Sequence, residues 1–321
     1  MNSSDLHQLI GGELLNNSKE CNINTVSTWE SAVENDVVFL FKGIAPKSPT
    51  KASVIVTCKP LDIKKTQIVL KNPKLAMQIL LEKLHPFRKS IVGSISDHAS
   101  ISSSAKVEQP VDIQSFTSVG SHSVIHQQSW IANNVSIGNN CIIGEGCIIY
   151  SNVVIYDNTV IGSNTIIHPG SVIGADGFGY VCVNNKHLKL SHKAGVVIGD
   201  NVEIGANSAI DRGCLENTII EDGVKIDNFV QVAHNVHIKH DTVVAAMTAI
   251  GGSVKIGYNC IIAGRVTIKD NISIGNCVTV LGMSAVTKNI EDNTIVSGYP
   301  AQNHITELKY QSKMKRFFKS N

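Results

Sequence analysis

From residue 95 onward, an aliphatic residue returns at every sixth position, and small or polar residues fill the positions between. The period runs unbroken from Ile95 to Ile173, resumes at Ile198 and ends at Val286. A typical unit is Ile137-Gly-Asn-Asn-Cys-Ile142. This period predicts a parallel β-helix, in which each six-residue unit forms one short strand and one corner.

The aliphatic residue of each unit is expected to point into a prism of stacked coils. Gly, Asn and Asp at the corners tolerate the left-handed backbone angles that a tight bend demands. A single unit cannot bury its apolar face, so the coils must stack on one another. We therefore predict a mainly β fold, with a parallel β-helix of hexapeptide repeats over residues 93–298.

Two interruptions break the period. The first spans residues 175–197, and the second adds four residues between Ile210 and Ile220. Each must leave the stack of coils and return to it. Loops of this kind often carry the function of a solenoid, although a tolerated surface loop is the alternative for both.

The segments that flank the repeats lack the period. Residues 1–92 are predicted to form a small α/β domain, with strands over 36–41, 52–56 and 67–70. Asn72-Pro73 predicts the start of a helix that ends near His85-Pro86. We predict a second helix over 305–318 within a C-terminal tail, residues 299–321.

The tail helix is basic, because it carries Lys309, Lys313, Lys315, Arg316 and Lys319. Such a helix attracts an acidic partner, although a solvated helix that packs between subunits is the alternative. Five charges without other basic patches are too few to predict nucleic-acid binding.

Composition adds two expectations. The net charge is only +2, and no signal peptide or apolar run of about 18 residues is present, so we expect a cytoplasmic protein without an integral membrane segment. The eight cysteines form no Cys-x-x-Cys pair, and Cys141, Cys147 and Cys260 each follow an aliphatic residue by four positions. We interpret the cysteines as reduced core residues, with metal or disulfide roles as the less favoured alternatives.

Three closely spaced histidines, His234, His237 and His240, are candidates for a metal site or for catalysis. Residues three apart on a strand-and-corner path point in different directions, so the three imidazoles should not converge on one metal within a chain. A neutral imidazole can instead act as a general base, and His234 is the best placed of the three. From the spacing alone, a surface histidine remains an alternative.

Several long segments then point to a family. They are Gly174-Ala-Asp-Gly-Phe-Gly-Tyr180, residues 197–206, Ile210-Asp-Arg-Gly213, Ile226-Asp-Asn228 and Gln231-Val-Ala-His-Asn235. The chain closely resembles the UDP-3-O-(3-hydroxyacyl)glucosamine N-acyltransferases of lipid A biosynthesis in these segments, and more loosely in its first domain. Related O-acyltransferases of the same pathway share the β-helix but lack the Asp-Gly-Phe-Gly-Tyr motif and such a first domain.

The resemblance implies a homotrimer of left-handed β-helices with active sites between neighbouring subunits. The implied reaction moves a 3-hydroxyacyl chain from the phosphopantetheine thioester of acyl carrier protein to the 2-amino group of UDP-3-O-acylglucosamine, with no metal and no bound cofactor. His234 matches the general base of the family, and Gly252 matches the backbone N–H that stabilises the oxyanion.

The resemblance also implies residues for binding substrate and the carrier arm: Asp176, Phe178, Tyr180, Asp227 and Asn228. Asp227 and Asn228 could instead orient the base, or be ordinary turn-forming residues.

Three positions depart from the family pattern. Phe39 and Phe41 fall where relatives hold uridine, but Phe41-Lys-Gly-Ile-Ala45 replaces the usual segment. Asn271 takes the place of a second histidine, and Ala285 falls at the end of the acyl channel, where a small residue would admit a longer chain. The altered first domain leaves open an acyltransferase for another nucleotide sugar or one with a coenzyme A donor. A non-catalytic or metal-dependent hexapeptide protein is a further alternative.

Overall fold

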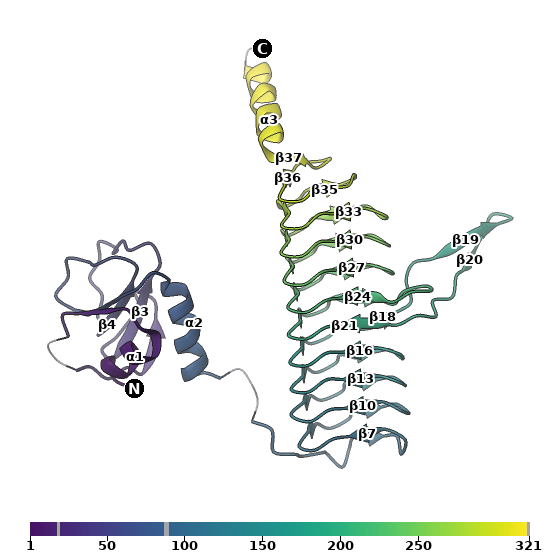
Figure 1. Cartoon of the computed structure of the whole chain (residues 1–321), viewed down its shortest axis with the longest axis horizontal. Coiled ribbons are helices and arrows are strands. Elements are labelled where there is room, and N and C mark those ends of the chain that lie inside the picture. Colours follow the sequence, from purple (N-terminus) through teal and green to yellow (C-terminus); the bar gives the residue numbers. More distant parts are fainter. Residues whose placement is uncertain (18–19, 87–89, 320–321) are drawn as a thin grey trace. The chain divides into compact units, whose positions relative to one another are not determined.

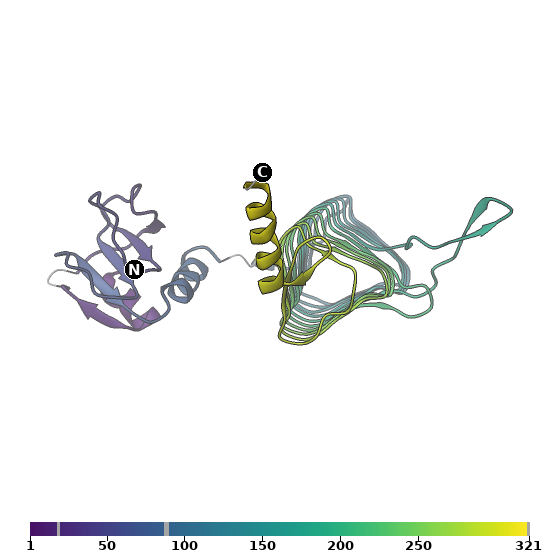
Figure 2. The same ribbon diagram turned by 90° about the horizontal axis from the view of Figure 1, so that it is seen from above.

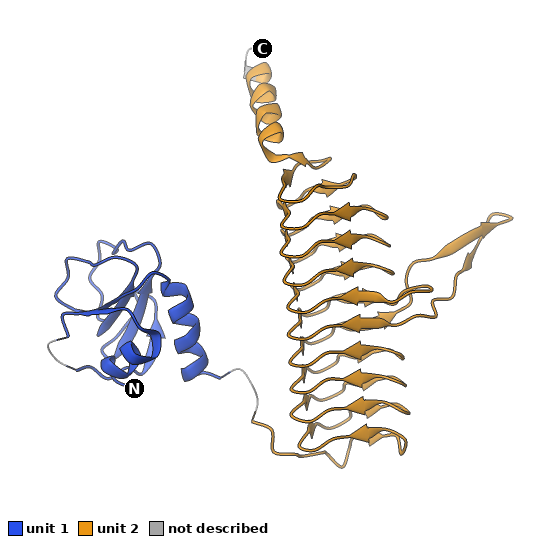
Figure 3. Ribbon diagram, viewed as in Figure 1, with its two compact units in different colours: residues 1–89 blue, residues 90–321 orange. Residues whose placement is uncertain are grey.

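The computed structural model describes residues 1–17, 20–86 and 90–319. The chain divides into two compact units, residues 1–89 and residues 90–321 (Figure 3). The C-terminal helix belongs to the second unit. Residues 320–321 of the predicted tail and the side chain of Lys319 lie outside the described part.

The first unit contains one five-stranded sheet in the order β1-β5-β4-β3-β2. Its elements are α1 (Ser3–Ile10), β1 (Glu13–Leu15), β2 (Thr25–Ser27), β3 (Asp36–Leu40), β4 (Val54–Thr57), β5 (Thr66–Val69) and α2 (Pro73–Leu84). The three predicted strands are confirmed as β3, β4 and β5, which pair in parallel, whereas β1 runs antiparallel to β5. β1 and β2 have three residues each, too few to show an alternating pattern.

Helix α2 begins and ends where the sequence predicts. The Asn72 side chain accepts a hydrogen bond from the Leu75 N–H at 3.1 Å, and Pro73 occupies the first turn, where its missing N–H costs nothing. Ala76 and Leu80 are buried against the sheet, and the helix is capped at His85. Helix α1 was not predicted, although Asn2 and Asp5 form a capping box at its start.

The second unit is a parallel β-helix whose coils form three sheets, and Figure 2 shows the triangular cross-section. Face A consists of β7 (Lys106–Val107), β10 (Val124–Ile125), β13 (Ile142–Ile143), β16 (Val160–Ile161), β21 (Val196–Ile198), β24 (Thr218–Ile220), β27 (His237–Ile238), β30 (Lys255–Ile256) and β33 (Ser273–Ile274). Face B consists of β8 (Asp112–Ile113), β11 (Trp130–Ile131), β14 (Ile148–Ile149), β17 (Ile166–Ile167), β22 (Glu203–Ile204), β25 (Lys225–Ile226), β28 (Val243–Val244), β31 (Ile261–Ile262), β34 (Thr279–Val280), β36 (Ile295–Ser297) and β37 (Gln302–Asn303). Face C consists of β6 (Ser100–Ile101), β9 (Ser118–Val119), β12 (Ser136–Ile137), β15 (Val154–Ile155), β18 (Val172–Ala175), β23 (Ala209–Asp211), β26 (Gln231–Val232), β29 (Ala249–Ile250), β32 (Thr267–Ile268) and β35 (Ala285–Val286).

The periodic aliphatic residues fill the interior of the prism, as predicted. Ile125, Ile131, Ile143 and Ile149 each have no exposed surface. Coils stack in parallel, for example with Ile125 paired to Ile143. Burial of these side chains on every face stabilises the stack, because removing apolar surface from water is favourable.

One coil offers a matched test of this packing. Ile143 points inward and is fully buried, whereas its neighbour Ile142 points outward and is 40% exposed. Ile143→Ala should lower the free energy of unfolding by about 2–5 kcal/mol, because it leaves a cavity. Ile142→Ala should cost far less. Urea denaturation of both variants measures the difference, and equal losses would contradict the inward orientation.

Asparagine occupies the left-handed conformation at many corners, also as predicted. The φ angles of Asn140, Asn158, Asn235 and Asn271 lie between 54° and 62°. Asparagine adopts this region more readily than most side chains do.

The cysteine prediction holds for three residues and is wrong for two. Cys141, Cys147 and Cys260 are fully buried in the inward slot, where burial raises the pKa of the Cys141 and Cys260 thiols. Cys182 and Cys277 are exposed, because the first lies in an interruption and the second at a corner.

Both interruptions lie outside the regular coils. The first follows β18 and forms a hairpin of β19 (Tyr180–Val183) and β20 (Lys186–Lys189) that projects from the prism (Figures 1 and 2). The second is a turn between β23 and β24. The predicted tail helix is confirmed as α3 (His304–Lys319). Across the described residues, no helix is long and apolar enough to cross a membrane.

Candidate active site

His234 lies at the corner between β26 and β27, where face C turns into face A. Its side chain is half-buried. Its Nδ1 lies 3.0 Å from Oδ1 of Asn235, the residue that occupies the left-handed position of the same corner. The corner therefore supplies both the imidazole and the group that contacts it.

The amide of Asn235 has its orientation fixed by the backbone. Its Nδ2 donates to the Glu216 carbonyl at 2.9 Å, and its Oδ1 accepts from the Cys214 N–H at 3.1 Å. Oδ1 is therefore the atom that faces His234, and an oxygen can only accept there. The hydrogen of a neutral His234 must then sit on Nδ1, which leaves the lone pair on Nε2 free to take a proton.

The second interruption builds this arrangement. Its turn supplies Cys214 and Glu216, and Thr218 at the start of β24 accepts the Asn235 N–H at 2.9 Å. A regular coil would offer none of these contacts at this point. The four added residues thus hold Asn235 in place rather than forming a merely tolerated loop.

Gly252 lies one coil further along the same corner and directly against the ring. A Cβ at Gly252 would lie 2.8 Å from both Cε1 and Nε2 of His234, so only glycine fits beside the ring as it stands. The next residue, Ser253, donates its N–H to the His234 carbonyl at 2.9 Å. The Gly252 N–H itself has no acceptor among residues 1–17, 20–86 and 90–319. The position is suited to an oxyanion donor, and that role stays a prediction.

The first interruption brings Gly177 and His192 against His234, and Gly179 against His192. A Cβ at Gly177 would lie 2.6 Å from the His234 Cβ, and the His192 ring lies against the His234 ring with centroids 5.2 Å apart. A Cβ at Gly179 would lie 3.0 Å from Cε1 of His192. The glycines of the Asp-Gly-Phe-Gly-Tyr motif thus let the hairpin approach both imidazoles.

The other residues of this motif turn away from His234. Phe178 is 86% exposed, and its ring packs against Tyr180 with ring centroids 5.0 Å apart. Asp176 forms an ion pair with Lys189 of β20, and this hydrogen bond holds the pKa of the Asp176 carboxyl below its usual value. Within one chain, the predicted binding residues of the hairpin stand beside the site rather than against the base.

Arg212 fixes the base of the hairpin to the prism. Its Nε donates to the Gly174 carbonyl and its Nη2 to the Asp157 carbonyl, both at 2.7 Å. The guanidinium also lies over the Tyr156 ring. These contacts hold the start of the interruption where Gly177 meets His234.

Asp211 on β23 is a charged group close to the two imidazoles. Gln231 donates to its carboxylate at 2.9 Å. Burial raises the pKa of the Asp211 carboxyl, and the Gln231 hydrogen bond and the charges of His234 and His192 offset part of that effect. A carboxylate here favours positive charge on either imidazole.

Asp211 should therefore cost stability at neutral pH. The folded chain holds the Asp211 proton more tightly than the unfolded chain does, so stability falls as pH rises from the unfolded pKa through the folded pKa. Asp211→Asn keeps an acceptor for Gln231 and removes the charge. We expect it to raise the Tm at pH 7 and to have no such effect at pH 3, where the carboxyl is protonated in both states. Thermal unfolding at both pH values measures this, and a lower Tm at pH 7 would contradict it.

Asp227 and Asn228 lie at a different corner of the prism, where face B turns into face C. The Asp227 carboxylate accepts the Asn228 N–H at 2.7 Å and the Ala246 N–H at 3.1 Å, and Asn228 Oδ1 accepts the Ala206 N–H at 2.7 Å. Neither side chain orients His234 within the chain. Asn235 does so, and the sequence analysis missed it.

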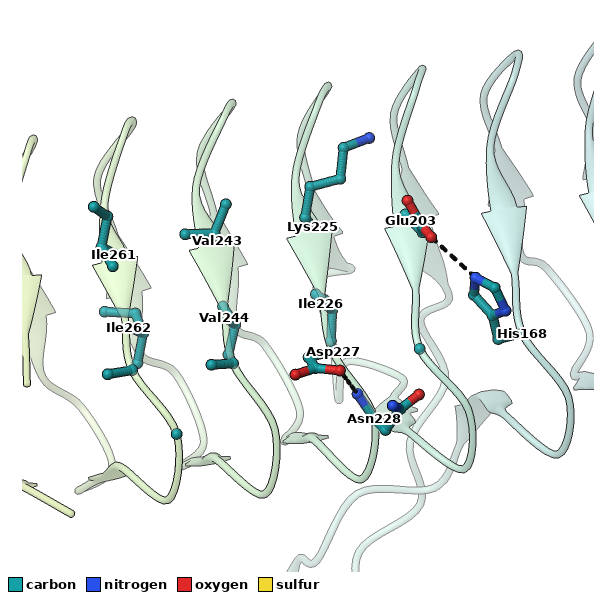
Figure 4. A pocket seen from close by; sticks show the side chains of 14 residues that line it. His168, Glu203, Lys225, Ile226, Asp227, Asn228, Val243, Val244, Ile261 and Ile262 are labelled. Carbon is teal, nitrogen blue, oxygen red and sulfur yellow. Dashed lines mark hydrogen bonds and ion pairs between the residues drawn. The ribbon is translucent and has the colours of Figure 1, made fainter. Parts of the chain in front are cut away.

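The two residues line a groove of about 750 Å³ along face B (Figure 4). A hydrogen-bonded pair, His168 Nε2 and Glu203 Oε1 at 3.0 Å, borders it at one end. Its lining residues are His168, Glu203, Gly205, Lys225, Ile226, Asp227, Asn228, Val243, Val244, Ala245, Ile261, Ile262, Ala263 and Gly264. The groove offers a polar end and an apolar wall of aliphatic side chains.

Asn271 and Ala285 both lie further along the prism. The Asn271 N–H donates to the Gly252 carbonyl at 2.9 Å, so this residue occupies the His234 corner two coils on. Ala285 on β35 pairs with Thr267 on face C, the face that also carries β26. Ala249, Thr267 and Ala285 therefore form a row of small and medium side chains on face C, which starts next to Gln231 of β26.

Phe39 and Phe41 belong to the first unit. Phe39 lies in β3 and packs against the core of the sheet. Phe41 follows the strand, and its side chain is 50% exposed. Of the two, Phe41 presents more of its ring to a ligand.

The other two histidines of the cluster point elsewhere, as the path along the coil predicts. His237 Nε2 pairs with Glu221 at 2.6 Å on face A, and His240 pairs with Asp241 and stacks on Tyr258. No group of three metal-ligating side chains occurs in the described ranges.

The coils match a known repeat. The model of the bacterial transferase hexapeptide (six repeats) matches residues 122–157, 140–175 and 217–252. The hexapeptide repeat thus includes His234 and Gly252 in its third match.

Relatives with hexapeptide repeats are named acyltransferases. UDP-3-O-acylglucosamine N-acyltransferase 1 of Gloeobacter violaceus is 51% identical over 149 residues, 46% of this chain and 43% of that protein. UDP-3-O-acylglucosamine N-acyltransferase 2 of Legionella pneumophila (strain Paris) is 51% identical over 159 residues, 48% of this chain and 46% of that protein. The chain thus spans less than half the length of these relatives.

A solved structure extends the likeness to more of the chain. A UDP-N-acetylglucosamine acyltransferase from Bacteroides fragilis has a TM-score of 0.51 and 28% sequence identity, and the match covers 68% of this chain and 78% of that one.

Proposed function

We propose that this chain is an N-acyltransferase of lipid A biosynthesis. It would move a 3-hydroxyacyl chain from the phosphopantetheine thioester of acyl carrier protein to the 2-amino group of UDP-3-O-(3-hydroxyacyl)glucosamine. The observation that carries the proposal is that Nε2 of His234 lies against Gly252, whose backbone N–H has no acceptor in the part of the chain that the structure describes. Relatives with the same printed activity support the choice of substrates.

In this reaction the amine nitrogen attacks the thioester carbon, and Nε2 of His234 takes the proton that the nitrogen loses. The oxygen of the thioester becomes an oxyanion, which the Gly252 N–H stabilises. The carbon–sulfur bond then breaks, and the imidazolium returns the proton to the departing thiolate. Acid–base help of this kind contributes about 10²- to 10⁴-fold, and one oxyanion donor about 10²- to 10³-fold.

Asn235 and Asp211 support the proton transfer. The Nδ1–H of His234 donates to Asn235 Oδ1 in both protonation states, which keeps Nε2 directed at the reacting groups. The carboxylate of Asp211 stabilises the imidazolium once it has formed.

The substrates would bind along the surfaces that meet His234. We assign the carrier arm to the groove with Asp227 and Asn228 and to Asn271, and the end of the acyl chain to Ala285 on face C. Asp176, Phe178 and Tyr180 of the first interruption would contact the sugar nucleotide. Phe41, with Phe39 behind it, would contact the uracil ring.

Assembly as a homotrimer would bring the groove of one chain to the His234 corner of another. Phe229, Met247 and Met283 lie at the corner between faces B and C, with exposed fractions of 56%, 52% and 72%, and Arg265 occupies the same position in the coil between the two methionines. Their φ angles of 57° to 61° lie in the region that asparagine takes at other corners, and a bulky side chain is uncommon there. Exposed apolar side chains in strained positions favour burial against a second copy of the chain.

A donor and acceptor panel tests the proposal. The purified protein is incubated with 3-hydroxyacyl carrier proteins of several chain lengths or with coenzyme A thioesters, and with UDP-3-O-acylglucosamine or other nucleotide sugars. We expect transfer from the carrier protein to UDP-3-O-acylglucosamine to be the fastest. Faster transfer from coenzyme A, or to another nucleotide sugar, would replace the proposed substrates.

A further inference from the structure

His192 is a buried histidine that the first interruption brings to the active-site corner. Its residue is 6% exposed, and its Nδ1 lies 3.0 Å from the Leu190 carbonyl oxygen. Because a carbonyl oxygen only accepts, Nδ1 of His192 must carry the hydrogen. A neutral His192 therefore presents a lone pair at Nε2.

The Nε2 atom of His192 lies close to the His234 ring. The His192 Nε2 and the His234 Cδ2 both lie 2.8 Å from one point, the place that a Cβ on Gly177 would take. The two rings meet edge to face at 63°. His192 thus lies at the Cδ2 edge of His234, while Asn235 occupies the Nδ1 side and Gly252 lies at Nε2 and Cε1.

We propose that His192 is a positioning residue for the base His234, an inference that rests on the proposed function. Its ring blocks rotation of the His234 side chain away from Gly252. Its Nε2 lone pair adds negative potential beside His234 and so stabilises the imidazolium that forms when the amine loses its proton. His192 touches no reacting atom in this account.

Two carboxylates lie near the His192 and His234 imidazoles. Asp211 of β23 interacts electrostatically with both imidazoles, and Asp176, the residue after β18, interacts with His192 while paired to Lys189. Both carboxylates favour protonation of an imidazole. Both carboxylates are still present when His192 alone is replaced. A change in the titration midpoint of His234 then reports the loss of the His192 ring.

Two variants separate the effect of the His192 Nε2 lone pair from the effect of packing by its ring. His192→Phe keeps a planar ring and removes the lone pair, whereas His192→Gln supplies an amide oxygen as an acceptor. His187, an exposed histidine on β20, provides the matched control as His187→Phe. The Tm of each variant reports whether the fold is intact.

We expect His192→Phe to lower kcat by roughly 10- to 100-fold with little change in KM, because a misplaced base slows the chemical step rather than binding. The midpoint of the His234 titration should move to lower pH, because the imidazolium loses a stabilising lone pair. His192→Gln should recover part of both effects. His187→Phe should change neither.

Imidazole ¹⁵N NMR measures the His234 titration without substrate, so it tests the inference even where acyl transfer is absent and the proposed function fails. A folded His192→Phe protein with native kcat and a native His234 midpoint would overturn the positioning role. An equal loss of kcat in His192→Phe and His192→Gln, with a lower Tm and an unchanged His234 midpoint, would show that His192 contributes only packing. That result would also overturn the positioning role.

Discussion

Replacing His234 with alanine should lower the rate of acyl transfer by roughly 10²- to 10⁴-fold, the usual contribution of a positioned general base. The loss should fall on kcat, because the imidazole takes its proton in the transition state and adds little to substrate binding. His240→Ala is the matched control, since His240 is an exposed histidine on another corner of the same stretch of coil. Steady-state rates of both variants measure the difference.

The fold gives an independent check on the His234 variant. The His234 carbonyl, not its side chain, accepts the Ser253 N–H that joins two coils, so alanine should leave the stack intact. A variant with native Tm and native kcat would remove His234 from the mechanism.

Gly252→Ala, which adds a single methyl group, should lower the rate of acyl transfer nearly as much as His234→Ala does. Gly252→Ala places a Cβ 2.8 Å from Cε1 and Nε2 of His234, closer than carbon atoms approach in folded proteins. The ring must move, and both the base and the N–H donor then lose their alignment, for which we expect a loss of about 10²-fold. The change keeps the backbone N–H, so the effect comes from displacement.

Gly282→Ala is the control for this substitution. The nearest atom to a Cβ at Gly282 is the Gly264 carbonyl oxygen at 3.4 Å, an ordinary contact, so activity should be preserved. Equal activity of the two alanine variants would contradict the close approach of Gly252 to the base.

Much of the β-helix could be predicted from sequence because its interactions are local and periodic. Ile125 and Ile143 occupy equivalent positions in consecutive coils, so the six-residue spacing alone places both inside. The same reasoning predicted Asn140 and Asn235 at corners. It failed for Cys182 and Cys277, which do not occupy the inward slot of a coil.

The active-site neighbourhood could be predicted only in part, because its contacts join distant residues. His234 and Gly252 share one corner, and their match to a known family pointed to both. Asn235 resembles any other corner asparagine, and only the turn with Glu216 shows that its oxygen faces the base. His192 lies in a segment without periodicity, so no spacing rule links it to His234.

The most direct test of the account is the chemical linkage of the product formed by the native protein. Acyl carrier protein with a 3-hydroxyacyl chain and UDP-3-O-(3-hydroxyacyl)glucosamine are incubated with the protein, and the nucleotide sugar is analysed by mass spectrometry before and after mild base. The account predicts that the sugar gains a second 3-hydroxyacyl group in a base-stable amide. A properly folded protein that gives no second acyl group, or only a base-labile ester, would contradict it.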